Sequence, residues 1–513
     1  MFGGTLGGPV FKNKLFFFVD YQGQRFDHPS STSPITVFTT AEQAGDFSQL
    51  LTQKGIQLYN PCAAGTGING VPCAAAAVRQ PFVNNQIPIG MISSVAKALF
   101  ASSLYPTTIN NNLQQNALNT TTSLLNSNQG DIKVDYQFSD KDRVSGRFTR
   151  AYQNNPSTNS QPLIGNGSST APIWNTVVDW TRTINPSLVN DARFGWSHIT
   201  LNTGSSFVSG VGAFGNSIGI GNGNPNGLNG LLALNVGNIL NAGSGNANGL
   251  GNSLVTQSFD DHVWQLDDSV IYTRGRHSIK FGFQYWDEPI KTFYSGNNGE
   301  LGLMDFTSNF TASAATNPLT NSGEGMADFF LGLPTEFGRG LSTGRTWEQS
   351  SKIFAGYAQD TWRLTDRLTV NVGLRYEAHT PWVETNNQQV NYDLKTQQIV
   401  FANQNGASRA LYNGVYGGKD FQPRLGFVWT PAMLGGHTVV RGAFTISSYL
   451  EGTGTNLRLP INPPFNPAEL DVPYHGVVPH QPERVARTTP ASQVRCCVSG
   501  IQMCSLPCLI SGT

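Results

Sequence analysis

The segment DIKVDYQFSDKDRVSGRFTR, residues 131–150, decides the fold. In its first half, Ile132 and Val134 fall on one face, and charged or polar residues alternate with them on the other. The second half resumes the alternation after the short polar stretch 139–142. A period of two is typical of a β-strand with one apolar and one polar face, and two such strands around a tight turn predict a hairpin.

The same pattern recurs along the chain. VWQLDDSVIYTRGRHSIKFGFQYW at 263–286 and KIFAGYAQDTWRLTDRLTVNVGLRYE at 352–377 are the clearest copies, and weaker ones flank 12–14, 185–187 and 430–436. Six hairpins give twelve strands, most of them long enough to supply the roughly 9 to 11 residues that a tilted membrane-crossing strand needs. Helical periodicity is confined to MISSVAKALFASSL at 91–104, which predicts a short helix within a loop.

Short and long connections alternate between these strands. The turns inside hairpins are tight, whereas the connections between hairpins cover approximately 27–130, 152–175, 199–258, 287–350 and 378–420. In an up-and-down meander, alternate connections lie at the same end, so all the long loops should project from one rim. Segment 201–250 has no Asp, Glu, Lys or Arg and is nearly half Gly and Asn. We expect it to form little core by itself, and to be either anchored on something rigid or disordered.

The composition excludes several classes of protein. The 513 residues carry 32 Lys and Arg against 32 Asp and Glu, so the formal charge is zero and electrostatic binding of nucleic acid is not expected. No stretch approaches the roughly 18 to 20 apolar residues of a membrane-spanning helix. The opening MFGGTLGGPVFKNK lacks a secretory signal, so either the protein stays inside the cell or the chain lacks its beginning.

Two observations favour lipid on the apolar face of the strands. Tryptophans occur near strand ends, where a membrane interface would hold them, although they could also anchor the core of a sandwich: Trp180, Trp196, Trp264, Trp286, Trp362 and Trp429. Charged residues gather on the polar face of the hairpin at 131–150: Asp131, Lys133, Asp135, Arg143 and Arg147. Water in the lumen of a barrel would solvate these charges, and so would bulk water on the exposed face of an ordinary sheet.

Catalytic chemistry is not predicted, and neither is a bound cofactor. No zinc-protease motif, phosphate-binding loop or C-x-x-C pair occurs. The best titratable cluster lacks a second histidine at usable spacing, so no metal site is expected from it: Asp260, Asp261, His262, Asp267 and Asp268.

Cysteines occur in two groups. Cys62 and Cys73 could close a disulfide in an exported loop or remain free thiols. The other four, whose C-x-x-x-C spacing without neighbouring histidines makes a poor zinc site, are Cys496, Cys497, Cys504 and Cys508.

A family resemblance rests on short motifs in a fixed order. They are FGGTLGGPVFKNKLFFFVDYQGQRF at 2–26, GDFS at 45–48, DYQFSDKDRVSGRF at 135–148, RGRHSIKFGFQY at 274–285, DFFLGLP at 328–334, FAGYAQDTWRLTDRLTVNVGLRYE at 354–377 and FQPRLGFVW at 421–429. Together they resemble TonB-dependent outer-membrane receptors of the Oar-like type, abundant in acidobacteria. The resemblance implies a large outer-membrane barrel, about 22-stranded in intact members, that encloses a plug and imports a scarce nutrient with energy delivered by TonB.

This chain departs from that pattern at both ends. The signal peptide, the N-terminal domain, the TonB box and the plug of the family are missing, so contact with TonB is expected only through that missing region. We therefore expect residues 1–465 to form a partial transmembrane antiparallel up-and-down β-barrel, about 12 to 16 strands of a larger one, with long extracellular loops. Residues 466–513 form an atypical Cys- and Pro-rich tail, expected to be disordered or out of frame.

The resulting hypothesis is a non-enzymatic piece of an outer-membrane transporter. Its partners would be outer-membrane lipid and a small-molecule or oligomeric nutrient. The alternatives are a non-transporting adhesin or structural barrel, and a secreted soluble all-β carbohydrate-binding protein.

Overall fold

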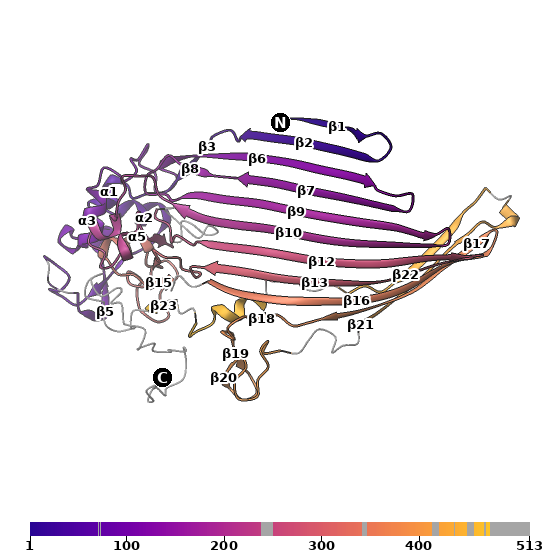
Figure 1. Ribbon diagram of the computed structural model, residues 1–513. Coiled ribbons are helices and arrows are strands. Elements are labelled where there is room, and N and C mark those ends of the chain that lie inside the picture. The colour runs from indigo at the N-terminus through magenta and orange to yellow at the C-terminus, as the bar shows by residue number, and fades with distance from the viewer. Residues whose placement is uncertain are drawn as a thin grey trace, which may run out of the picture.

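A computed structural model describes residues 1–69, 71, 73–237, 250–340, 346–412, 420–434, 437–448, 456–465 and 468–471. The largest element among them is one antiparallel sheet (Figure 1). Its strands follow one another in chain order: β1 (Phe2–Phe11), β2 (Leu15–Asp27), β6 (Ala117–Gln137), β7 (Asp142–Asn154), β9 (Asn166–Asn185), β10 (Leu188–Ser206), β12 (Gln257–Arg274), β13 (His277–Tyr294), β16 (Thr346–Thr365), β17 (Leu368–His379), β21 (Asp420–Trp429) and β22 (Val440–Thr445). The six predicted hairpins and their order are confirmed.

Three short strands extend this sheet near the long connections. β3 (Ser31–Ile35) and β8 (Ser157–Asn159) pair with β6, and β18 (Val383–Glu384) pairs with β16. Among the described strands no pairing joins β1 to β22, so these two form the edges of the sheet.

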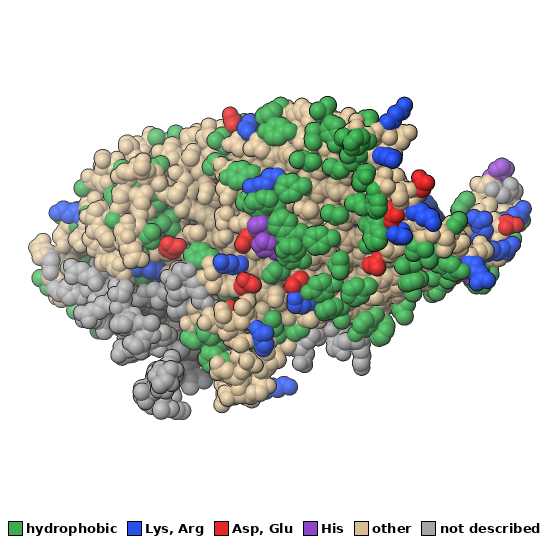
Figure 2. All heavy atoms as spheres, in the orientation of Figure 1, with side chains coloured by type: hydrophobic (Ala, Val, Ile, Leu, Met, Phe, Trp, Pro, Cys, Tyr) green, Lys and Arg blue, Asp and Glu red, His purple; other side chains and the backbone are tan. Residues whose placement is uncertain are grey.

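The two faces of the sheet differ as the alternation predicts. Ile132, Phe281 and Val372 are 53%, 47% and 48% exposed, and no protein layer covers the face on which they lie, which we call the outer face. Asp131, one position from Ile132, is only 3% exposed on the opposite, inner face. Figure 2 shows apolar side chains gathered in a broad band across the outer face.

The connections before β16 fold together at one end of the sheet, β19 (Val390–Asp393) and β20 (Gln398–Phe401) of the connection after β17 lie apart from them, and the tight turns lie at the other end (Figure 1). We call the folded connections the loop cap. Its helices are α1 (Thr40–Gln43), α2 (Ser48–Lys54), α3 (Ser94–Phe100), α4 (Phe214–Ser217) and α5 (Gly325–Leu331). Short 3-10 turns occur at η1 (Val83–Asn85), η2 (Ile89–Met91) and η3 (Pro225–Gly227), with two more, η6 (Ala432–Leu434) and η7 (Asn456–Ile461), elsewhere. The predicted helix within 91–104 is confirmed as α3.

Small sheets complete these connections. β4 (Tyr59–Cys62) pairs with β5 (Ala75–Pro81), and β19 pairs with β20. A four-stranded sheet contains β11 (Ala233–Val236), β14 (Leu303–Phe306), β15 (Glu336–Gly340) and β23 (Ala468–Asp471). β23 is the described part of the tail that begins at 466; from 472 onward, including its four cysteines, the tail lies outside the described residues.

The main hydrophobic core lies in the loop cap. Side chains from connections far apart in sequence meet there, with Phe38, Leu58, Leu231 and Phe330 at most 1% exposed. The described part of segment 201–250, residues 201–237 and 250, shares this core through buried residues such as Leu231. This arrangement follows from the surroundings: a sheet whose apolar face meets lipid needs no protein core behind it, whereas loops in water do.

Candidate functional site

The five charged residues predicted to share one face do lie together on the inner face. Lys133 Nζ is 2.9 Å from Asp135 Oδ2, and Arg143 Nη2 is 3.0 Å from Asp135 Oδ1. Arg147 Nη2 lies 2.6 Å from Asp131 Oδ1. The register explains the pairs, since Lys133 stands opposite Arg147 across the β6–β7 ladder. Asp20 stands opposite Asp131 on the neighbouring strand β2, so cations and carboxylates alternate on this part of the inner face.

A second inner-face cluster was missed by the sequence reasoning. His379 Nε2 lies 3.0 Å from Glu377 Oε2 and 3.8 Å from Asp420 Oδ2, and the Arg375 guanidinium also binds Glu377. Alternation in RYEAH at 375–379 places Arg375, Glu377 and His379 on one face. Asp420 could not be added, because it follows a long connection whose end gives no register; the structure pairs it with Glu377.

The titratable cluster around His262 is divided between the two faces. Asp260, His262 and Asp268 lie on the outer face with Trp264, whereas Asp261 and Asp267 lie on the inner face. The expectation that no second histidine comes near is wrong. His198 on β10 stands directly opposite His262 on β12, and its Nε2 is 2.6 Å from Asp260 Oδ1.

The tryptophans are arranged in two groups, with one exception. Trp180, Trp362 and Trp429 are 37%, 38% and 38% exposed on the outer face, toward the tight turns. Trp264 is 43% exposed and pairs with Trp196, nearer the loop cap. Trp286 is the exception: Phe281 and Phe283 are on the outer face, so alternation places Trp286 on the inner face.

The band between these tryptophans is apolar, and charged side chains flank it on both sides (Figure 2). Histidine side chains appear at the border on the loop-cap side. An apolar band bordered by aromatic and charged residues is the surface that an outer-membrane barrel presents to lipid. Among the described residues, no helix is both apolar and long enough to cross a bilayer.

A polar cavity with a volume of about 450 Å³ lies on the inner face at the base of the loop cap. Thr203 of β10 and Ser169 of β9 form a cross-strand pair that lines this cavity. Their side chains project from the inner face, whereas the side chain of His198 on β10 projects from the outer face. Apart from Val255, its other lining residues present hydroxyl, amide, imidazole or backbone groups, and none is Asp, Glu, Lys or Arg. They are His28, Ser123, Asn155, Ser157, Gly167, Ser168, Gly204, Ser205, Val255 and Gln257. Such a lining suits a ligand that offers and accepts hydrogen bonds without carrying charge.

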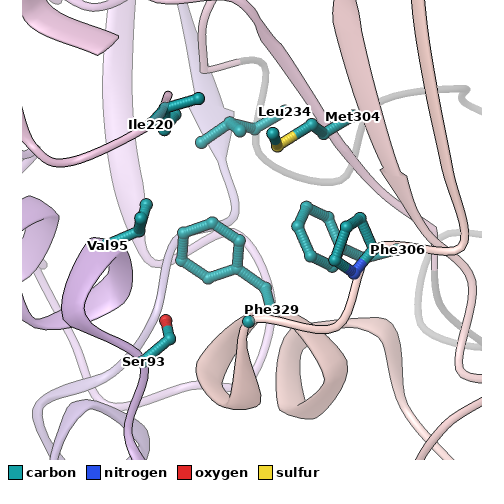
Figure 3. Close-up of a pocket in the computed structure, with 9 residues that line it drawn as sticks. Ser93, Val95, Ile220, Leu234, Met304, Phe306 and Phe329 are labelled. Atoms are coloured by element: carbon teal, nitrogen blue, oxygen red, sulfur yellow. The ribbon is translucent and has the colours of Figure 1, made fainter. Parts of the chain in front are cut away.

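A second cavity lies inside the loop cap (Figure 3). Val95 of α3, Ile220, Leu234, Phe306 and Phe329 point into it. Its volume of about 20 Å³ has room for about one water molecule, and its lining is almost entirely apolar. It is a packing void in the core of the cap and does not bind a ligand of useful size.

The cap contains two buried carboxyl groups, Asp328 and Glu42, both of which are hydrogen-bonded. Asp328 of α5 accepts hydrogen bonds from the Phe310 and Thr311 backbone N–H groups at 3.0 and 2.8 Å, and from the Thr311 hydroxyl at 2.6 Å. Burial nevertheless raises the pKa of Asp328 to about 7, although the hydrogen bonds oppose this. Glu42 closes a capping box with Thr39, and burial raises the pKa of Glu42 to about 7 as well.

The cap also contains the first two cysteines of the chain. Cys62 at the end of β4 and Cys73 are joined by a disulfide, which closes a loop with a sequence separation of 11.

Comparison with protein families gives one match over nearly the whole chain. Residues 1–494 match the family described as outer membrane beta barrel domain. The chain belongs to this family. It is therefore a protein of the bacterial outer membrane, and the partial antiparallel barrel with long extracellular loops is the fold expected of it. The comparison with curated proteins finds no match for this sequence.

Several solved structures are similar to this outer-membrane barrel. The outer membrane transporter YddB from Escherichia coli has 9% identity and a TM-score of 0.40, over 86% of this chain and 37% of that one. FpvA of P. aeruginosa bound to heterologous pyoverdines has 10% identity and a TM-score of 0.31, over 62% and 37% of the two chains. The siderophore receptor PiuA from Acinetobacter baumannii has 9% identity and a TM-score of 0.26, over 83% and 61%. This chain thus spans less than two thirds of each.

Proposed function

We propose that this chain forms the wall and the extracellular loop cap of a TonB-dependent transporter of the Oar-like type, which binds a scarce nutrient and passes it through the barrel. The observation that carries the proposal is the arrangement of the two ends. One end has only tight turns, and the other has a cap with its own core above a polar cavity of about 450 Å³.

The inner face provides the second step of this proposal. Below the cavity, the Asp131–Arg147 and Lys133–Asp135–Arg143 pairs place charge on the inner face, where a lumen filled with water would solvate it. A ligand released from the cavity would move along this polar wall. The uncharged lining of the cavity favours a hydroxyl-rich nutrient such as an oligosaccharide over an anionic one.

The partners follow from the same scheme. Lipid covers the apolar band of the outer face, and a plug and a TonB-contacting segment encoded upstream would gate the lumen and receive energy. Binding and gated passage require no bond to be broken, so the proposal includes no enzymatic step.

An adhesin or structural barrel would use the same loop cap to bind a partner without transport. The presence of a plug and a TonB box directly upstream in the gene favours the transporter, and their absence favours the adhesin. The third alternative, a soluble carbohydrate-binding protein, does not fit the exposed apolar band or the outer-membrane family.

The test uses the intact gene and two adjacent positions on opposite faces. A strain that lacks the gene is grown on defined nutrients to find the one it no longer takes up, and uptake is restored with the gene. Thr203→Trp would fill the cavity and block uptake, whereas Asn202→Trp, which projects from the outer face, would leave it unchanged. Equal uptake by both variants would contradict the proposed path.

A further inference from the structure

His198, Thr200, Asp260 and His262 meet on the outer face at its border with the loop cap. We propose that His198, Asp260 and His262, with Thr200 positioning the carboxylate, bind a divalent transition-metal ion of the zinc class. The inference is independent of nutrient transport, because these side chains and the cavity lie on opposite faces of the sheet.

The strand register brings the four side chains together. His198 pairs with His262, and Thr200 pairs with Asp260, so the four Cα atoms form a rectangle across two strands. All four positions have the same parity and therefore project from one face. Directly opposite residues of an antiparallel pair have Cβ atoms about 4.5 to 5.5 Å apart, close enough for two imidazoles to share one ion.

The donor atoms are already close to the geometry that an ion requires. Asp260 Oδ1 is 2.6 Å from His198 Nε2, and Asp260 Oδ2 is 3.8 Å from His262 Nε2. The ligand atoms of the two histidines and the aspartate all lie within 4.8 Å of one another. Zinc binds nitrogen and oxygen at about 2.0 to 2.2 Å, which puts tetrahedral ligand atoms roughly 3.4 Å apart. Shifts of about 1 Å, within reach of side-chain rotation, would therefore complete the site.

The donor types match the class of ion. Two imidazoles and one carboxylate suit zinc, nickel, copper and iron(II), and disfavour calcium and magnesium, which prefer oxygen ligands. The Thr200 hydroxyl is 2.8 Å from Asp260 Oδ1 and 3.2 Å from His198 Nε2, where it holds the carboxylate in place.

Aromatic neighbours hold the imidazoles in place. The two rings stack with centroids 3.9 Å apart and planes 11° apart. Because the lone pair of an imidazole nitrogen lies in the ring plane, one ring must rotate out of this stack for both histidines to bind the same ion. Trp174 stacks on His198 at 4.6 Å, and Arg150 covers the other side of Trp174 at 3.8 Å. The side chains of His198 and His262 remain 17% and 30% exposed, which lets an ion enter from the headgroup layer.

Two other clusters among the described residues lack part of this arrangement. His277 and Asp360 form a pair at 2.7 Å with one histidine only. Glu377, His379 and Asp420 also come within range, but the Arg375 guanidinium already binds Glu377, whereas the cation opposite Asp260 at the proposed site, Lys291, lies on the neighbouring strand β13. The first of these clusters provides a matched control, because it is also a histidine–carboxylate pair on the outer face with a tryptophan beside it.

The test titrates Ni²⁺ and Zn²⁺ into the full chain in detergent, after alkylation of the free cysteines. Binding is measured by the heat released or absorbed in a calorimetric titration. Ni²⁺ also quenches the fluorescence of nearby tryptophans, which gives a second readout. Trp174 and Trp196 lie 4.6 and 5.8 Å from the His198 ring, so we expect saturable, partial quenching. His198→Asn and His262→Asn should each weaken binding at least tenfold and abolish this quenching, whereas His277→Asn should leave both unchanged.

Binding that is unchanged in His198→Asn and His262→Asn, or no saturable binding by the parent chain, would overturn the proposal. Circular dichroism establishes that each variant keeps its strands. If a histidine variant loses them, Asp260→Asn decides, because it keeps both imidazoles and the cross-strand stack. A tenfold loss of affinity in Asp260→Asn then supports the site, and parental affinity refutes it.

Discussion

The sheet offers a direct test of which face meets lipid, at two adjacent valines of β9. Val178 is 40% exposed on the outer face, between Trp180, about 7 Å along the strand, and Trp174, about 13 Å the other way. Val177 is on the inner face, opposite Arg147. Val178→Arg puts a charge into the apolar band, which costs roughly 2 to 4 kcal/mol near the bilayer midplane. This corresponds to a fall of about 30- to 900-fold in the folding equilibrium constant.

Val177→Arg is the matched control, since residue type, strand and depth are nearly the same. Its charge would meet water, with only cross-strand repulsion from Arg147, about 0.2 to 1 kcal/mol. Both variants are refolded into lipid vesicles over a urea series, and the folded fraction is measured by heat-modifiable electrophoretic mobility. If Val177→Arg lost as much stability as Val178→Arg, or more, the assignment of the outer face to lipid would be wrong.

Three further predictions concern the loop cap. Because burial raises the pKa of Asp328 from 3.8 to about 7, the folded cap keeps a proton that the unfolded chain releases, so cap stability should fall as the pH rises from about 4 to 7 and level off above. Asp328→Asn should reduce this slope in thermal melts; an unchanged slope would exclude Asp328 as its source. The double variant Cys62→Ser, Cys73→Ser should lower the free energy of unfolding of the cap by about 3 kcal/mol, because the unfolded chain regains the entropy of an 11-residue loop. Proteolysis of the cap should become faster, and reduction of the disulfide in the parent chain should have the same effect. Gly332→Ala should lower the cap's melting temperature, because Gly332 has φ 72° and an added Cβ would lie 2.6 Å from Ser93 Cβ; an unchanged temperature would show that α5 and α3 can separate freely.

The sequence predicts only those parts of the strands that lie in the membrane. β6 extends over 21 residues, but only its second half, from about Asp131, shows clear alternation. Its first half, rich in Asn, Ser and Thr, continues into the loop cap, where both faces meet water or protein. The alternation of apolar and polar residues arises because one face of the strand meets lipid. It therefore stops at the edge of the membrane, although the strand itself continues beyond that edge.

The side-chain clusters were predictable only inside hairpins. A tight turn fixes which residues oppose each other, so the charged pairs of 131–147 could be inferred from one segment. His198 and His262 belong to different hairpins joined by the long connection between β10 and β12, and nothing in that connection sets the register. The second histidine, and the pairing of Asp420 with Glu377, therefore required the structure.

The two ends of the molecule are stabilised by different interactions. Outer-face side chains such as Phe281 exchange water for lipid without binding one strand to the next, so the strands are held by their backbone hydrogen bonds. In the cap, Leu231 and Phe330 are fully buried, and each such side chain contributes about 1.5 to 3 kcal/mol. Because these residues come from different connections, no loop is stable without the others. A segment as poor in charge as 201–250 is therefore tolerated: in its described part, 201–237 and 250, neighbouring loops cover apolar residues such as Leu231, and Gly and Asn residues form turns.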